Sequence, residues 1–228
     1  MTKPDEYFHL DGWEHRELFD GVEHVWEVLD RLPAYLESLV TGVRIEGTVQ
    51  EGAFLRGPVF IGEGAVIEAG AMVMGPTWIG PGTVVRHGAY VRGGCLIGAR
   101  CVVGHATEVK GSIFLDGAQA PHFNYVGDCV LGRHVNLGAG AKLSNLKNDG
   151  TEVVIVGENG QRWSTGRRKV GAIIGDGAQL GCNCVTSPGT LIGPHTSVYP
   201  NAVPRGIIPA RSIVKLRQQL QVVERSDG

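Results

Sequence analysis

The sequence predicts an all-β solenoid, a parallel β-helix of six-residue repeats that follows a short helical segment. Three observations favour this fold class. An aliphatic residue recurs at every sixth position, a small residue recurs two positions before the next aliphatic residue, and glycine accounts for 35 of the 228 residues. That share of glycine is about twice the average. Because the chain is 43% hydrophobic, so much glycine indicates regularly spaced turns rather than disorder.

The six-residue period is unbroken over twelve repeats. Its aliphatic positions are Val43, Val49, Leu55, Ile61, Ile67, Val73, Ile79, Val85, Val91, Ile97, Val103 and Val109. Each repeat supplies a short strand and a turn. Since alternate residues of a strand point to opposite faces, both the aliphatic and the small residue are expected to point inward. Three repeats would form one coil of 18 residues, and successive coils would stack about 4.8 Å apart.

The period becomes irregular in the stretch "GAQAPHFNYVGD". Counting onward, Leu115 and Pro121 are the next inward positions, and Val126 then comes one residue early. We therefore expect one coil to be a residue short between Pro121 and Val126. We also expect this shift to turn His122 and Tyr125 out of the regular columns, towards Arg92 and Lys110, and so to mark the active-site corner.

A long excursion interrupts the solenoid at residues 146–170. The stretch "TEVVIVGENGQRWSTG" predicts a β-hairpin, two extended runs around a Gly-Glu-Asn-Gly turn. The period resumes at Ile174 and continues through Leu180, Thr186, Ile192 and Val198. Residues 42–209 are thus expected to form a solenoid of about nine coils, and long excursions from solenoids are often functional.

The two ends of the chain lack the six-residue period. Within residues 1–41, apolar positions follow helical spacing. Asp20 with Glu23 resembles a capping box, and Pro33 is expected to open a second short helix. This segment is interpreted as a helical cap over the first coil, with a partner-binding helix as the alternative. Residues 210–228 are expected to add one extended segment and then to fray or reach a neighbouring subunit.

Composition excludes several function classes. The net charge of −2 argues against nucleic-acid or anionic-membrane partners. The five cysteines form no CxxC pair, which argues against disulfides or zinc and favours a reducing, cytoplasmic setting. Cys95 and Cys101 occupy small inward positions and are interpreted as core residues. No signal peptide or bilayer-length apolar run is apparent.

A period of 18 places surface residues in columns. Arg92 and Lys110 are expected to be stacked neighbours, two cations with no carboxylate in their column. Such a pair predicts an anion site, and two solvated surface charges are the alternative. His87, His105 and His122 follow another edge, which raises the possibility of a metal site.

The motifs "AYVRGG", "TEVKGS", "APHFNYVGD", "HVNLGAG", "SNLKNDG" and "RRKVGAIIGDG" occur in this order. Over roughly residues 85–200 they resemble the acetyltransferase half of the bifunctional N-acetylglucosamine-1-phosphate uridylyltransferase/glucosamine-1-phosphate acetyltransferases and related sugar-1-phosphate nucleotidylyltransferases. The resemblance implies a left-handed β-helix, homotrimers with active sites between subunits, and acetyl-CoA as cosubstrate. It also implies a sugar-phosphate substrate.

The same resemblance implies roles for individual residues. His122 would be the general base, a task for which a neutral imidazole is suited. The phosphate ligands would be Arg92, Lys110, Tyr125 and Lys169. Two asparagines, Asn136 and Asn145, would lie near the sugar and its reacting amine. The coenzyme side would comprise the backbone of Ala139 and the positions of Cys182 and Tyr199.

Some features depart from that family. Leu146 replaces an aromatic residue, the hairpin replaces a short loop, and Tyr199 is large enough to narrow the pantetheine channel. The first 41 residues contain no Gly-rich nucleotide loop, so pyrophosphorylase activity is not expected. The γ-class carbonic anhydrases share the expected fold, but their HxxxxH pattern is absent because Lys110 and Gly127 stand at the required positions. No metal is expected.

The sequence therefore predicts a cytoplasmic homotrimer that transfers an acyl group from CoA to the amine of an amino sugar phosphate or nucleotide amino sugar. The alternative is a non-catalytic or regulatory protein that binds sugar phosphates and has lost the coenzyme channel. Leu146 and Tyr199 favour this alternative.

Overall fold

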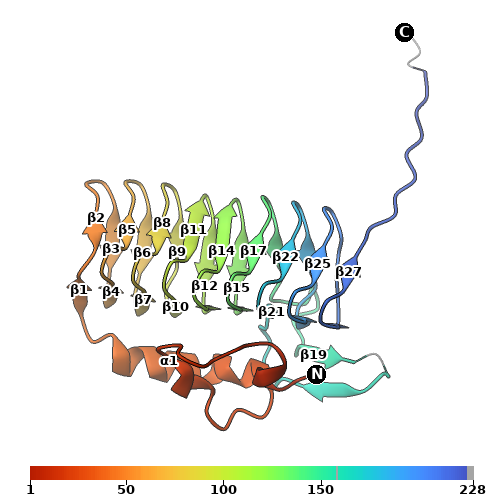
Figure 1. Ribbon diagram of the computed structural model, residues 1–228, viewed down its shortest axis with the longest axis horizontal. Coiled ribbons are helices and arrows are strands. Elements are labelled where there is room, and N and C mark those ends of the chain that lie inside the picture. Colours follow the sequence, from red (N-terminus) through yellow and green to blue (C-terminus); the bar gives the residue numbers. More distant parts are fainter. Residues whose placement is uncertain (158, 225–228) are drawn as a thin grey trace.

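The computed structural model describes residues 1–157 and 159–224 and confirms the predicted parallel β-solenoid. Three parallel sheets form the sides of a long prism, and one α-helix runs alongside it (Figure 1). We refer to the sheets as A, B and C and to the edges between them as the A–B, B–C and C–A corners. The chain passes from A to B to C in each coil.

In the described part of the chain, sheets A and B have nine strands each and sheet C has seven. Sheet A comprises β1 (Val43–Ile45), β4 (Val59–Ile61), β7 (Thr77–Ile79), β10 (Cys95–Ile97), β13 (Ile113–Phe114), β16 (Val130–Leu131), β21 (Ala172–Ile174), β24 (Thr190–Ile192) and β26 (Ile207–Ile208). Sheet B comprises β2 (Thr48–Val49), β5 (Val66–Ile67), β8 (Val84–Val85), β11 (Val102–His105), β14 (Gln119–His122), β17 (Asn136–Leu137), β22 (Gln179–Leu180), β25 (Ser197–Val198) and β27 (Ile213–Val214). Sheet C comprises β3 (Phe54–Arg56), β6 (Met72–Met74), β9 (Tyr90–Val91), β12 (Glu108–Lys110), β15 (Tyr125–Gly127), β18 (Lys142–Leu143) and β23 (Val185–Thr186).

The interior of the prism is filled by the residues that the period places inward. From Ile61 to Val109, every sixth aliphatic residue is fully buried in one continuous core. The register over these coils is 18 residues, so that Ile61 pairs with Ile79 and Ile79 with Ile97. Cys95 and Cys101 fill small inward positions and are buried, which confirms their interpretation as core residues.

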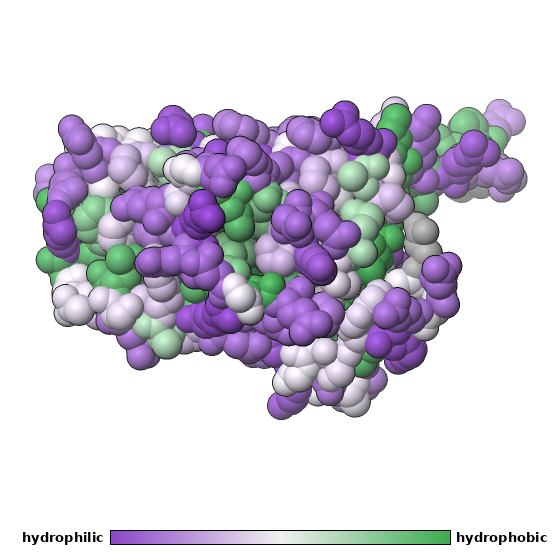
Figure 2. All heavy atoms as spheres, turned by 60° about the horizontal axis from the view of Figure 1, so that its bottom comes forward, coloured by the Kyte–Doolittle hydropathy of each residue, from purple (hydrophilic) through white to green (hydrophobic). Residues whose placement is uncertain are grey.

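The N-terminal segment does not cap the first coil, contrary to expectation. It forms three 3₁₀ turns, Pro4–Glu6, Arg16–Phe19 and Val25–Glu27, and the helix α1, Val28–Leu39. These elements lie along the outside of sheet A (Figure 1) and share a second core with outward residues of sheet A, including Phe60, Leu96 and Leu115. The first coil is left uncovered, and Val43 is 59% exposed. Figure 2 shows a largely hydrophilic outer surface on this side of the molecule.

The start of the helix also differs from the prediction. The capping carboxylate is that of Glu27, which accepts hydrogen bonds from the backbone N–H groups of Glu23 (3.0 Å) and His24 (3.1 Å). Pro33 lies inside α1 rather than opening a second helix. A proline inside a helix costs about 3 kcal/mol. Burial of Leu29, Leu32 and Leu36 against sheet A offsets that cost, since each such side chain contributes about 1.5–3 kcal/mol.

The missing residue of the period lies at the C–A corner and not between Pro121 and Val126. Ile97 pairs with Phe114, and Val103 pairs with Ala120, both 17 residues on. Phe114 and Ala120 are therefore the inward residues, and the step of five residues falls between Val109 and Phe114. The next coil repeats this shortening, because Phe114 pairs with Leu131.

Hydrophobicity alone could not locate this step, because Ile113, Phe114 and Leu115 are all apolar. Ile113 and Leu115 point outward, and both are fully buried in the second core, beneath the N-terminal segment. The apolar cover on sheet A therefore permits outward aliphatic residues. An outward position on an uncovered sheet would be expected to be polar.

The predicted hairpin is present and is inserted at the same C–A corner. β19 (Val154–Val156) pairs antiparallel with β20 (Arg162–Ser164), with Ile155 opposite Trp163. Glu158, in the expected turn, lies outside the described residues. Val153 and Ile155 are buried, and the hairpin lies beside the N-terminal segment (Figure 1). This position brings the base of the excursion against the site described below.

The C-terminal segment contributes β27, as the extended segment expected there, and then leaves the solenoid (Figure 1). Beyond it Leu220 and Val222 are 87% and 94% exposed. Across residues 1–157 and 159–224, no helix has the length and apolarity required to cross a membrane.

Candidate functional site

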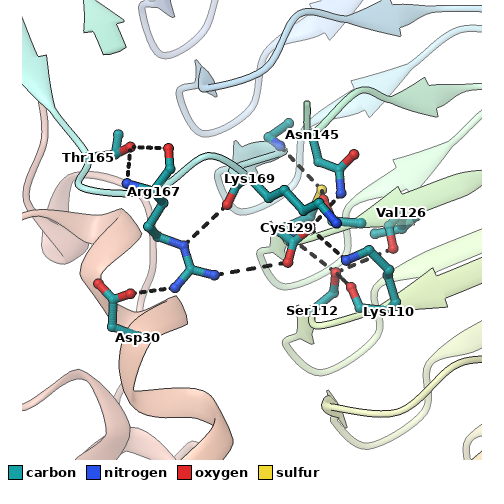
Figure 3. Close-up of polar contacts among 12 residues, drawn as sticks. Asp30, Lys110, Ser112, Val126, Cys129, Asn145, Thr165, Arg167 and Lys169 are labelled. Atoms are coloured by element: carbon teal, nitrogen blue, oxygen red, sulfur yellow. Dashed lines mark hydrogen bonds and ion pairs between the residues drawn. The ribbon is translucent and has the colours of Figure 1, made fainter. Parts of the chain in front are cut away.

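Polar side chains gather at the C–A corner, where the two shortened coils and the excursion meet. We call this group the corner network; it comprises Lys110, Tyr125, Asp128, Asn145 and Arg167. Lys110 ends β12, Tyr125 begins β15, and Asn145 follows β18, so successive coils of sheet C supply them. Arg167 comes from the base of the excursion. Figure 3 shows Arg167 between Asp30 of α1 and the Lys110 and Asn145 side chains.

Asp128 joins the members of the corner network. Its Oδ2 accepts hydrogen bonds from Lys110 Nζ at 2.9 Å and from Asn145 Nδ2 at 2.5 Å. Its Oδ1 lies 4.0 Å from a guanidinium nitrogen of Arg167. Asp128 is only 7% exposed, so these partners replace the water that would otherwise solvate its carboxylate.

Tyr125 is the aromatic member of this network. Its hydroxyl donates to Asn145 Oδ1 at 3.4 Å. Burial is the main cause that raises its pKa; the charge of Lys110 opposes this shift, and the carboxylates of Glu108 and Asp128 add to it. The phenol is therefore neutral at physiological pH and available as a hydrogen-bond donor.

Arg92 lies near the network but has its own partner. Its guanidinium donates to Glu108 at 2.7 Å, and this carboxylate raises the pKa of Arg92. Arg92 and Lys110 therefore each have a carboxylate partner, and the expected pair of unneutralised cations is wrong. The partners were missed because they lie outside the column, Glu108 in an adjacent column and Asp128 in the following turn.

The excursion adds two basic residues to this corner. Arg167 forms an ion pair with Asp30 of α1, and its Nε donates to the carbonyl oxygen of Lys169 at 3.2 Å. Lys169 forms an isolated antiparallel bridge with Leu146, so the excursion begins and ends beside Asn145. The Lys169 side chain is exposed and has no ion pair among the described residues.

His122 lies at the other side of sheet C, on the B–C corner. Its carbonyl oxygen accepts from the N–H of Gly140, and that of Ala139 accepts from the N–H of Asn183. His122, Ala139 and Cys182 thus occupy the same corner on three successive coils. Tyr199 lies one coil further along and is 46% exposed, with Lys215 Nζ 5.4 Å from its ring centroid.

His122 and Tyr125 stay in the regular columns, so the expected turn out of these columns is wrong. Tyr125 nevertheless lies near Arg92 and Lys110, whereas His122 does not belong to the corner network. His122 pairs with His105 and Tyr125 with Glu108 in an undisturbed register. The reason is that the missing residue lies before these strands, at the preceding C–A corner. The His122 ring has no hydrogen bond to the corner network within residues 1–157 and 159–224.

Asn136 is separated from the other candidate residues. It lies in β17 on the outer face of sheet B, between Gln119 and Gln179 of the neighbouring strands. Sheet B and sheet C face different directions, so one chain does not bring Asn136 together with Lys110.

His87 and His105 stack on each other, with ring centroids 5.7 Å apart. Both Nδ1 atoms face backbone carbonyl oxygens, those of Ala69 and His87. Wherever the structure describes the chain, no three His, Cys, Asp or Glu side chains are grouped as metal ligands.

The sequence interpretation missed Asp128 and Arg167. Asp128 belongs to the quoted stretch "APHFNYVGD", and its position after a glycine at a shortened corner was the available indication. Nothing in the sequence indicated a site role for Arg167, because the excursion lacks the six-residue period that would predict its position.

Comparisons with known proteins agree with the fold. A family model described as bacterial transferase hexapeptide (six repeats) matches residues 58–93. The chain is 37% identical over 178 residues to a bifunctional sugar-1-phosphate nucleotidylyltransferase/acetyltransferase of Sulfurisphaera tokodaii, covering 78% of this chain and 44% of that protein. It is 40% identical over 216 residues to the bifunctional protein GlmU of Methanococcus maripaludis strain C7, covering 95% of this chain and 52% of that protein.

A solved structure of a UDP-N-acetylglucosamine acyltransferase from Francisella novicida is similar with a TM-score of 0.48 and 14% identity. That match covers 71% of this chain and 60% of the other. The chain forms a hexapeptide-repeat β-helix, and part of it matches the transferase hexapeptide family model. More particularly, it resembles GlmU and the bifunctional sugar-1-phosphate nucleotidylyltransferase/acetyltransferase, and it spans about half the length of these relatives.

Proposed function

We propose that this protein is a CoA-dependent N-acyltransferase that acetylates an amino sugar phosphate such as glucosamine 1-phosphate, or a nucleotide amino sugar. The observation that carries the proposal is the arrangement along sheet C. The corner network lies at the C–A corner and His122 lies at the B–C corner. Strand β15 runs between these corners, and its Tyr125 side chain contacts Asn145 of the network. The three residues of β15 span about 10 Å, which is comparable to the length of a bound sugar phosphate.

The phosphate would bind at the C–A corner. Lys110 uses one of its three N–H donors on Asp128, and Arg92 uses part of its guanidinium on Glu108. The remaining donors of both, the exposed ammonium of Lys169 and the Tyr125 hydroxyl would face the phosphate. Charge-assisted hydrogen bonds of this kind are the strong ones in proteins.

His122 would act as the general base. In the step we propose, the amine nitrogen attacks the thioester carbon of acetyl-CoA and His122 accepts a proton from that nitrogen. The C–S bond then breaks, and the proton passes to the departing CoA sulfur. The backbone at Ala139 would border the acetyl group, and Cys182 and Tyr199 would border the pantetheine arm.

A homotrimer would complete this site. Asn136 lies on sheet B, and an amine-binding role beside His122 requires sheet B of one protomer to face sheet C of the next. Asn145 would contact the sugar within the same protomer. We expect the trimer to be cytoplasmic.

The test is thioester loss from acetyl-CoA on adding glucosamine 1-phosphate. His122→Ala should lower kcat by about 10²–10⁴-fold with KM nearly unchanged, because general-base catalysis contributes that much. His87→Ala is the matched control, since it changes an exposed histidine on the same corner two coils away. Turnover by His122→Ala at the wild-type rate would contradict the assignment of the base.

A sugar-phosphate-binding protein without catalysis is the second candidate. Tyr199 with Lys215 over its ring adds bulk beside the Cys182 corner, and Leu146 is 41% exposed at the base of the excursion. Calorimetric titration separates the two candidates. Binding heats for both glucosamine 1-phosphate and acetyl-CoA would support the transferase. A binding heat for the sugar phosphate alone would support the binding protein.

A further inference from the structure

Asp128 occupies the centre of the corner network, yet the proposed reaction gives it no role. It is a carboxylate, so it would not itself bind a phosphate. It is also almost completely buried, and two of its partners, Lys110 and Asn145, are proposed substrate ligands. A buried charge in contact with two such ligands is placed to fix their positions.

Asp128 determines which way the Asn145 amide points. An ionised carboxylate only accepts hydrogen bonds, so the Asn145 group facing it at 2.5 Å must be the NH₂ group. The amide oxygen is consequently turned to the Tyr125 hydroxyl. Asn145 thus presents an acceptor, rather than a donor, towards Tyr125.

The carboxylate itself is held by the backbone of the shortened corner. Asp128 has φ +51°, a left-handed conformation that Asp and Asn tolerate better than most residues. Its N–H donates to the carbonyl oxygen of Lys110 at 3.0 Å, and its own carbonyl accepts from Gly171 at 2.7 Å. Asp128 is therefore pinned to the coils on both sides, which limits movement of its side chain.

Arg167 completes the arrangement from the outer side. Its guanidinium forms an ion pair with Asp30 of α1, and its Nε donates to the backbone carbonyl of Lys169 (Figure 3). A second guanidinium nitrogen lies 4.0 Å from Oδ1 of Asp128. The Asp128 carboxylate therefore contacts Lys110 and Asn145 directly, and it is linked to Lys169 through Arg167.

We propose that Asp128 is a positioning residue for the phosphate-bearing acyl acceptor. It orients the Lys110 ammonium and the Asn145 amide, and Arg167 links it to Lys169 and α1. This inference rests on the proposed function, because it concerns the ligands of the same substrate. The orientation of the Asn145 amide does not depend on turnover.

Asp128→Asn is the sharpest test, because it keeps the shape and tolerates the left-handed backbone. The substituted amide has one NH₂ group, which must face either Arg167 or the Lys110 and Asn145 donors, so one of these interactions is lost. We expect KM for glucosamine 1-phosphate to rise about 10–100-fold, as for loss of a charged hydrogen bond. The value of kcat should stay within about threefold, because binding lost equally in ground and transition states raises KM alone.

The matched control is Asp116→Asn. Like Asp128, Asp116 is a corner carboxylate that accepts a hydrogen bond from the preceding coil, from the Ala99 N–H at 2.9 Å. It lies between β13 and β14, at the A–B corner, and is not part of the corner network. The KM of Asp116→Asn for glucosamine 1-phosphate should equal that of the wild type. An Asp128→Asn protein whose KM stays within twofold of the wild type would overturn the proposal.

The side-chain amide resonances of Asn145 give a readout independent of activity. They should be protected from hydrogen exchange in the wild type and lose protection in Asp128→Asn, with the far-UV circular dichroism unchanged. If the wild type neither binds nor acetylates glucosamine 1-phosphate, the proposed function fails while this measurement still decides the orienting role. Equal protection in both proteins would refute that role.

Discussion

At the scale of single residues, His15 is a buried histidine surrounded by aromatic rings. It is 2% exposed, and the rings of Trp13, Tyr35 and Trp78 surround it edge-on. Its Nδ1 is 3.0 Å from the Tyr35 hydroxyl. Burial lowers its pKa to about 4, with partial opposition from the carboxylates of Asp116 and Glu17. His15 is therefore neutral in the folded protein at physiological pH.

This environment predicts a pH dependence of stability. An unfolded histidine has a pKa near 6.5, so below that pH the unfolded chain binds a proton that folded His15 does not. The free energy of unfolding should fall as pH decreases from about 6.5 to about 4, by about 3 kcal/mol in total. Urea unfolding at pH 7.5 and pH 4.5 measures this loss.

His15→Phe provides the comparison, because it keeps an aromatic ring and removes the titrating group. Its loss of stability between the two pH values should be smaller than that of the wild type by about 2–3 kcal/mol. An equal loss in both proteins would show that His15 does not titrate on unfolding.

At the scale of elements, the solenoid depends on glycine where adjacent coils touch. A Cβ on Gly104 would lie 1.6 Å from the carbonyl oxygen of Pro121, one coil away. That contact involves backbone on both sides, so neither strand β11 nor β14 can yield without losing its register. Pro121 was expected to point inward, but it is part of this close approach instead.

Gly104→Ala is therefore expected to destabilise the protein by about 3 kcal/mol or more, as severe overpacking does. The free energy of unfolding from chemical denaturation is the relevant measurement. Gly42→Ala is the control, because a Cβ there meets no atom within 4 Å and should change stability by less than about 0.5 kcal/mol. Similar values for both variants would contradict the tight coil contact.

At the scale of the whole molecule, the N-terminal segment belongs to the core of the protein. It shares a buried cluster with sheet A, and the backbone N–H of His9 donates to Asp176 at 2.7 Å. Arg167 links α1 to the corner network through Asp30. The segment therefore supports the side of the solenoid that bears the candidate site.

Removal of residues 1–41 should expose the outward apolar residues of sheet A, among them Phe60, Leu96, Ile113 and Leu115. Each exposed side chain costs about 1.5–3 kcal/mol, so the truncated chain should unfold or aggregate. Circular dichroism melting and light scattering would detect this. A monodisperse truncated protein with an unchanged Tm would instead fit a dispensable end cap.

The sequence predicted most of the fold and part of the site. The inward residues from Val49 to Val109, the hairpin and the neighbourhood of Lys110, Tyr125 and Asn145 followed from local spacing or from the resemblance. The first position of the period did not, because Ile45 rather than Val43 pairs with the inward Ile61. The side packing of the N-terminal segment did not, because an amphipathic helix indicates that it has a buried face and not which surface covers it. The position of the short corner was also hidden, since three consecutive apolar residues fit either register.

By itself, the sequence determined that the chain forms a solenoid, because a six-residue alternation of aliphatic and small residues can be buried only by stacking coils. The tertiary structure alone decided the partners of the charged residues. Asp128, Arg167 and Asp30 are far apart in the chain, and they meet because two shortened coils, the excursion and α1 converge on one corner. Electrostatic pairing depends on distance in space, which periodicity does not encode beyond neighbouring coils.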